Sequence, residues 1–135
     1  MGKRVTLLRH AKSSWDQPRL SDFDRPLNSR GERDAPAMGN LLHERNYCPQ
    51  VIISSDAARA KTTAQIVATK IDYPAEQIRF RNSLYLASPQ ALLQTFMDEA
   101  ENYADVMLVA HNPGLTELAN QLGNQRLDNL PTAGW

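Results

Sequence analysis

Short apolar runs alternate with segments of helical spacing along the whole chain, and this alternation limits the folds that it can adopt. Four runs have the composition of buried strands, at residues 4–8, 51–53, 78–80 and 106–109. The segments that separate and follow them carry apolar residues at the three- and four-residue spacing of a helix. An alternating strand–helix order is typical of a mostly parallel sheet with helices on both faces. We therefore expect a three-layer α/β fold.

The expected helices begin at residues that can cap a helix N-terminus. Asn28 precedes a helix over residues 29–45, and Pro36 inside it predicts a kink or a late start, because its nitrogen has no hydrogen to donate. A second helix is expected from about Asp56. The last two begin at pairs of a capping residue and a proline, Ser88–Pro89 and Asn112–Pro113.

Size and charge bound the class of protein. The 135 residues are expected to form a single domain over 1–135. Because 15 Lys+Arg balance 15 Asp+Glu, no overall charge attracts nucleic acid or an anionic membrane. The single cysteine, Cys48, excludes an internal disulfide and a cysteine-based metal site, and it suits a reducing compartment. With no apolar run near the roughly 20 residues of a membrane span, we expect a cytoplasmic protein without nucleic-acid or membrane partners.

Basic side chains lie where three of the predicted strands end. Arg9 and His10 follow the first strand directly. Arg59 lies in the first helical turn after the second strand, and His111 follows the fourth. Ligands of such sheets bind outside the carboxyl ends of the strands, so we expect these side chains to converge. Arginine forks and helix N-termini both bind phosphoryl oxygens, which predicts a phosphoryl-binding site.

Each of these residues also has a plain structural explanation. A single histidine at a strand end is more often a hydrogen-bonded structural residue than a catalyst, and an arginine in a first helical turn is usually solvated or salt-bridged. A two-histidine metal site lacks a third ligand at helpful spacing, and the arginines would repel a cation, so no metal is expected. His43 is expected on a helix surface. The convergence of four such residues favours a functional site.

An ordered set of motifs resembles the histidine phosphatase superfamily, which includes the phosphoglycerate mutases. Residues 7–13 (Leu-Leu-Arg-His-Ala-Lys-Ser) resemble its Arg-His-Gly signature, and residues 54–60 resemble its Ser-x-x-x-Arg-Ala segment. Residues 109–112 resemble its second histidine motif. Residues 24–27 (Asp-Arg-Pro-Leu) with Gly31 are similar to the smallest branch, the SixA-type phosphohistidine phosphatases. The resemblance covers nearly the whole chain and implies a phosphoglycerate mutase-like fold.

The resemblance implies roles for the residues at the strand ends. His10 would attack phosphorus and become phosphohistidine, and water would then hydrolyse this intermediate. Arg9 and Arg59 would hold the phosphoryl oxygens. His111 would add a hydrogen bond or a positive charge in the transition state. A neutral imidazole can attack if its other nitrogen is held as a donor, for which we expect a backbone carbonyl. No metal or other cofactor is expected, since these groups already surround the anion.

Residues beside these four could add donors to the substrate. Lys12, Ser13 and Asn112 are predicted to bind substrate, although Lys12 and Ser13 are equally explained as part of a polar loop. Ala11 stands where many members have glycine, so the backbone there is expected to keep a negative φ.

The expected substrate class depends on whether the site contains an acidic side chain that can protonate the leaving group. Members that cleave phosphate esters protonate the leaving alkoxide with Glu or Asp, but the corresponding residues 83–87 (Ser-Leu-Tyr-Leu-Ala) contain none. Asp16, Asp22 or Asp24 could substitute, although at least two of them are expected to be structural or surface residues. A phosphoramidate needs less help, because its ring nitrogen can be protonated from solvent. The short connections predict an open site. We therefore expect a metal-independent phosphohistidine phosphatase that acts on a phosphorylated protein.

Two other functions remain open at this point. A phosphatase for small phosphate esters would use a loop aspartate as its acid. A phosphate-dependent binding module would keep the same residues without turnover. The family's final strand pair would follow Leu130, so either the chain lacks the pair or it lies beyond Trp135. Without it, the first strand would be an open edge that can pair with another chain.

Overall fold

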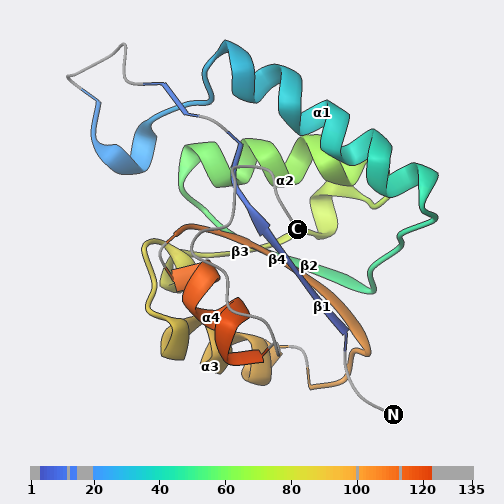
Figure 1. Cartoon of the computed structure of the whole chain (residues 1–135), viewed down its shortest axis with the longest axis vertical. Coiled ribbons are helices and arrows are strands. Elements are labelled where there is room, and N and C mark those ends of the chain that lie inside the picture. Colours follow the sequence, from blue (N-terminus) through green and yellow to red (C-terminus); the bar gives the residue numbers. More distant parts are fainter. Residues whose placement is uncertain (1–3, 12, 15–19, 100, 113, 123–135) are drawn as a thin grey trace.

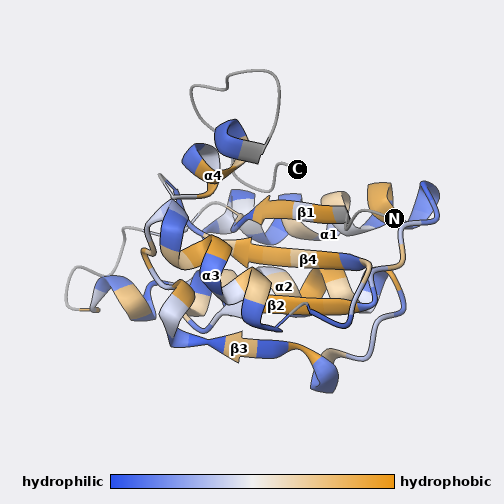
Figure 2. Cartoon of the chain, turned by 90° about the horizontal axis from the view of Figure 1, so that it is seen from below, coloured by the Kyte–Doolittle hydropathy of each residue, from blue (hydrophilic) through white to orange (hydrophobic). Residues whose placement is uncertain are grey.

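Four parallel strands form the sheet in a computed structural model that describes residues 4–11, 13–14, 20–99, 101–112 and 114–122. The strands are β1 (Arg4–Arg9), β2 (Val51–Ser55), β3 (Arg79–Arg81) and β4 (Asp105–Ala110). Their spatial order is β1-β4-β2-β3 (Figure 2), and every pairing between them is parallel. The predicted mostly parallel sheet is therefore confirmed, with strand ends within one or two residues of those expected.

Helices cover both faces of the sheet, as predicted (Figure 1). The helices α1 (Ser29–Glu44) and α2 (Ala58–Lys70) lie together on one face. The helices α3 (Pro89–Glu99) and α4 (Gly114–Leu122) lie on the other. Three short 3-10 turns complete the described elements: η1 (Asp22–Asp24), η2 (Ala75–Gln77) and η3 (Asn82–Leu84).

Strand side chains alternate between two apolar cores, one on each face of the sheet. In β4, Met107 and Val109 pack toward α1 and α2, whereas Val106, Leu108 and Ala110 pack toward α3 and α4. This alternation is the two-residue period of a strand, and burial on both faces explains why β2 and β4 are almost wholly apolar. Each fully buried Leu, Ile or Val contributes about 1.5–3 kcal/mol.

Helix starts follow the capping residues that the sequence contains. The Asn28 side chain accepts the backbone N–H of Gly31 at 2.8 Å. The Ser88 hydroxyl accepts that of Ala91 at 3.1 Å. The predicted late start of the first helix is wrong, because α1 begins at Ser29 and continues through Pro36. The Asn28 side chain supplies a hydrogen bond at the N-terminus of α1, which supports a helix start at Ser29.

The strand β1 lies at one edge of the described sheet, where it pairs with β4. Residues 123–135, after which the family's final strand pair would come, lie outside the described residues, and so does Pro113. Pairing of this edge with another chain stays a prediction. Across the described ranges, no helix combines the length and apolar character that crossing a membrane needs.

Candidate active site

Parallel register brings the two histidines together at the carboxyl end of the sheet. Arg9 pairs with Ala110 in the ladder, so the residues that follow each of them stand side by side. The backbone N–H of His10 donates to the carbonyl of Ala110 at 3.2 Å, which extends the ladder by one residue. The ring centroids of His10 and His111 lie 5.1 Å apart. The sequence prediction that these two side chains converge is therefore confirmed.

His10 is held by its Nδ1 atom. That nitrogen lies 2.7 Å from the carbonyl oxygen of Ala11, which can only accept a hydrogen bond, so Nδ1 carries the proton. The Nε2 atom then has a free electron pair, and the Nε of Arg59 donates to it at 3.4 Å. This is the tautomer expected from the sequence, and the group that holds it is a backbone carbonyl. His10 therefore has its unprotonated nitrogen, Nε2, on the side of Arg59.

The turn after β1 is fixed to α2 through Thr63. The backbone N–H of Ala11 donates to the Thr63 hydroxyl at 3.0 Å, and that hydroxyl donates to the carbonyl of Arg59 at 2.7 Å. Ala11 is fully buried. Among described non-glycine residues, positive φ occurs only at Asn46, Asp72 and Leu86, so the negative φ expected at Ala11 is confirmed.

Burial keeps both histidines uncharged near neutral pH. Burial lowers the pKa of His10 to about 4, opposed by the Ala11 hydrogen bond and reinforced by the charges of Arg59, Arg9 and Arg25. Burial also lowers the pKa of His111 to about 3, with further lowering from His10, Arg59 and Arg9 and an opposing effect of Asp22. His111 is therefore a neutral hydrogen-bonding group near neutral pH and not a cation.

Histidine titration is expected to differ sharply between the folded and unfolded chains. In ¹⁵N-edited NMR, His10 and His111 should stay neutral at pH 5, because their folded pKa values are about 4 and about 3. The same residues in urea should titrate near the usual value of about 6.5. Since the unfolded chain then binds more protons between about pH 6.5 and pH 4, the free energy of unfolding should fall as pH falls through that window. Titration of both folded histidines near 6.5 would contradict this description of the site.

Ser55 sets the orientation and tautomer of His111. The Ser55 hydroxyl oxygen lies 2.8 Å from Nε2 of His111 and accepts the backbone N–H of Ala57 at 3.2 Å. Donation of the hydroxyl hydrogen to Nε2 would satisfy both groups and place the proton of His111 on Nδ1. This Nδ1 is buried and has no hydrogen-bond partner among the described residues. In that tautomer His111 has a donor left for a substrate oxygen.

Arg59 connects the nucleophile to a carboxylate. Its side chain is only 3% exposed, and its Nη2 donates to Oδ2 of Asp22 at 2.9 Å. Its Nη1 donates to the backbone carbonyl of Asp22 at 2.6 Å. Because Nε faces His10 at the same time, the guanidinium spans the space between His10 and Asp22. The predicted placement of Arg59 beside His10 is confirmed.

A closed loop brings Asp22 and a third arginine to the site. Ser13 and Leu27 form an antiparallel bridge at its base. Arg25, which is 8% exposed, donates from Nε and Nη2 to Oδ1 of Asp22 at 3.1 and 2.9 Å. Its Nη1 donates to the Ser13 hydroxyl at 2.6 Å. Arg25 belongs to the motif at residues 24–27, but no role was predicted for it from the sequence. That motif was the signal that could have revealed its place in the site.

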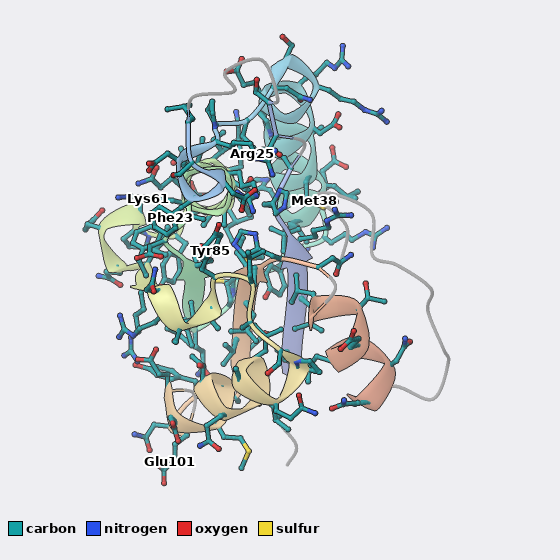
Figure 3. All side chains as sticks on the ribbon, turned by 90° about the vertical axis from the view of Figure 1, so that its left-hand side faces the viewer. Phe23, Arg25, Met38, Lys61, Tyr85 and Glu101 are labelled. Atoms are coloured by element: carbon teal, nitrogen blue, oxygen red, sulfur yellow. The ribbon has the colours of Figure 1, made fainter. Side chains whose placement is uncertain are left out.

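Tyr85 is a site residue that sequence reasoning missed. Its hydroxyl donates to Oδ2 of Asp22 at 2.5 Å. Its ring meets the ring of His111 edge-on, with centroids 5.5 Å apart, and the Arg59 guanidinium lies 5.9 Å from its centroid. Figure 3 shows Tyr85 below Phe23, and the two rings meet edge-on at 5.1 Å. Tyr85 lies between two leucines in the sequence, and nothing in that local pattern indicates a place in the site.

Asp22 is a charged group in this arrangement. Partial burial alone would raise the pKa of its carboxyl, but hydrogen bonds from Tyr85, Arg25 and Arg59 outweigh burial and hold that pKa well below its usual range. Burial and the bond to Asp22 raise the pKa of Tyr85. An ionised Asp22 cannot protonate a leaving group. Asp24, another of the three loop aspartates, is exposed and accepts a hydrogen bond from Ser21.

The other predicted site residues lie in several places. The charge of Arg9 acts on both histidines, and burial and Arg59 lower the pKa of Arg9 itself. Asn112 caps α4, its side-chain oxygen accepting the N–H of Thr116 at 3.1 Å. Ser13 supports Arg25. His43 is exposed, as expected. Two predicted residues, Lys12 and Asp16, lie outside the described residues.

The motifs at this site match a known family over more than half of the chain. The family model of the histidine phosphatase superfamily (branch 1) matches residues 5–82, which include Arg9, His10, Asp22, Arg25 and Arg59. The chain belongs to the histidine phosphatase superfamily. Within the described residues, no group of three or more His, Cys, Asp or Glu side chains is placed to hold a metal ion.

Similar proteins include members of the SixA type. A candidate phosphohistidine phosphatase SixA of Agrobacterium tumefaciens is 32% identical, and its structure superposes with a TM-score of 0.88 over 98% of this chain and 88% of that one. The protein histidine phosphatase SixA complexed with tungstate shares the fold, with a TM-score of 0.80 at 23% identity over 96% of this chain and 83% of that one. An uncharacterised chloroplastic protein of Arabidopsis thaliana is 33% identical over 90% of this chain. The chain spans 60% of the length of that plant protein.

Proposed function

We propose that this histidine phosphatase hydrolyses phosphohistidine on a partner protein through a phosphoryl intermediate on His10. The observation that carries the proposal is the Nδ1 hydrogen bond of His10 to the Ala11 carbonyl, 2.7 Å long. It fixes the proton away from Nε2 and leaves that atom free to attack. A neutral nucleophile also suits the lowered pKa of His10, about 4.

Positive charge around the nucleophile supports binding of a phosphoryl dianion. Arg9, Arg25 and Arg59 all act electrostatically on His10, and Asp22 is the carboxylate that pairs with two of them. Three cations and one anion leave an excess of positive charge where a phosphoryl group would lie. In the tautomer protonated on Nδ1, His111 is a further donor for an equatorial oxygen, because this buried nitrogen has no partner among the described residues. Catalysis of phosphoryl transfer rests largely on such positioning and charge.

The reaction takes place in two steps, phosphoryl transfer to His10 and hydrolysis of phospho-His10. In the first, Nε2 of His10 forms a bond to phosphorus, the P–N bond of the substrate breaks, and its electron pair stays on the substrate imidazole. Phospho-His10 then carries a proton on Nδ1, held by the Ala11 carbonyl. In the second step, water attacks phosphorus, the bond to Nε2 breaks, and inorganic phosphate leaves. His10 returns to its neutral form with Nδ1 still protonated.

The choice of a P–N substrate rests on the lack of a fitting acid beside His10 among the residues that the structure describes. Asp22, the carboxylate that contacts Arg59, is ionised and surrounded by donors. Asp22 could therefore not donate a proton to an alkoxide leaving group. A phosphohistidine ring that is already protonated needs no proton donor. The likeness to the Agrobacterium protein, at 32% identity over nearly the whole chain, supports the same substrate class.

Comparison of two substrate classes tests this function. Phosphate release from a phosphohistidine-bearing protein, in the presence of EDTA, is expected to exceed release from a panel of small phosphate esters in kcat/KM. Higher kcat/KM for an ester would replace the proposal with the ester phosphatase. Tight binding of the phosphorylated protein with no release from either class would favour the binding module.

A further inference from the structure

Asp22 stands at the opposite end of Arg59 from the nucleophile. Arg59 Nε faces Nε2 of His10, and Nη2 of the same guanidinium binds Oδ2 of Asp22 at 2.9 Å. A phosphoryl group bound between His10 and this guanidinium would have Asp22 on its far side. In-line displacement places the leaving group opposite the nucleophile. In this binding mode the leaving group would depart toward Asp22.

The carboxylate of Asp22 also faces solvent. Its side chain is 40% exposed, in contrast to 3% for Arg59. It belongs to η1, in the loop closed by the bridge of Ser13 with Leu27. Figure 3 shows Phe23 and Arg25, its neighbours in the chain, on the same side of the molecule as Tyr85. A phosphorylated side chain that enters from solvent passes this negative charge.

The leaving groups of phosphohistidine and of a phosphate ester differ in the charge that they would carry beside Asp22. When the second ring nitrogen of phosphohistidine is protonated, the imidazole carries a positive charge before the P–N bond breaks. The electron pair of that bond then neutralises the ring, which leaves as imidazole with its N–H intact, so the enzyme supplies no proton. An ester instead places growing negative charge on its oxygen. A nearby carboxylate stabilises the first arrangement and opposes the second.

We propose that Asp22 is the specificity-determining residue of the site, which selects substrates with a cationic leaving group over esters with an anionic one. This selection rests on the proposed function and names the basis of its substrate class. The four donors on Asp22, from Arg25, Arg59 and Tyr85, fix the carboxylate in place. Both of its oxygens are fully occupied, so Asp22 acts through its charge and not by accepting a proton.

The variant Asp22→Asn separates charge from shape. The amide keeps the size of the carboxylate and loses its charge. The ratio of kcat/KM for a phosphohistidine-bearing protein to kcat/KM for p-nitrophenyl phosphate is expected to fall roughly 10- to 100-fold. The ester rate should fall by a smaller factor than the phosphohistidine rate, because any loss of support for Arg59 lowers both rates alike. The matched control Asp34→Asn, on the exposed surface of α1 where Asp34 pairs with Arg30, should leave the ratio unchanged.

These measurements distinguish two roles of Asp22: selection of the leaving group by its charge, and positioning of Arg59 alone. A fall of both rates by the same factor would overturn the proposal, because Asp22 would then only position the arginine. If the unaltered enzyme fails to hydrolyse phosphohistidine, the proposed function is wrong, and the selection is tested separately with two small substrates. The leaving nitrogen of phosphoramidate is protonated and cationic before its bond to phosphorus breaks, whereas the leaving oxygen of p-nitrophenyl phosphate becomes anionic. Asp22→Asn should lower their ratio of kcat/KM, and an unchanged ratio would overturn the selection.

Discussion

Replacing His10 with asparagine is expected to lower kcat/KM by at least about 10³-fold, because the nucleophile is lost. The asparagine amide can still donate to the Ala11 carbonyl, as Nδ1 does at 2.7 Å, so the turn after β1 should keep its structure. The measurement is phosphate release under kcat/KM conditions, with thermal unfolding of the variant recorded in parallel.

A second histidine provides the control for this loss. His43 is exposed and pairs with Asp72 on the surface, so His43→Asn should retain full activity. Retention of more than about a tenth of the activity by a folded His10→Asn enzyme would contradict nucleophilic attack by His10. Electrostatic stabilisation alone would then carry the reaction.

The substitution Arg59→Lys is expected to lower kcat/KM by about 10²- to 10³-fold, the usual cost of removing a donor aimed at the transition state. Lysine keeps the charge but cannot span the space between His10 and Asp22, where three guanidinium nitrogens each have a partner. Binding of tungstate or vanadate, measured by inhibition, should weaken together with turnover.

An exposed arginine offers a matched comparison. Arg30 lies on the surface of α1, 66% exposed, so Arg30→Lys tests the same chemical change away from the site. It should leave kcat/KM and the inhibition constants within about twofold. An Arg59→Lys enzyme with equally small changes would show that the fork geometry of Arg59 is dispensable.

Local patterns explain why the fold could be predicted from the sequence. The apolar runs at 51–53 and 106–109 are buried on both faces, and only a central parallel strand needs that composition. Asn28 and Ser88 cap helices through contacts three residues away, which a sequence displays directly. Of the kink or late start predicted from Pro36, the late start was wrong, because α1 begins directly after the Asn28 cap and runs through the proline.

Some residues of the site could be predicted from local sequence, and others depend on contacts between distant parts of the chain. His10, Arg59 and His111 could be predicted because each follows a strand end, and parallel register brings strand ends together. Asp22 and Tyr85 meet across 63 positions, and nothing near either residue indicates the contact. Contacts of that separation arise only when η1 folds over α2, so the role of Asp22 was visible only in three dimensions.

Transfer of a labelled phosphoryl group to the enzyme tests the central claim most directly. A protein carrying [³²P]phosphohistidine is mixed with the enzyme in EDTA, the reaction is quenched in base within milliseconds, and the label is mapped by digestion. We predict an acid-labile, base-stable label on the peptide that contains His10, formed before phosphate appears and absent from His10→Asn. Phosphate release with no label on the enzyme, or label on a residue other than His10, would contradict the account.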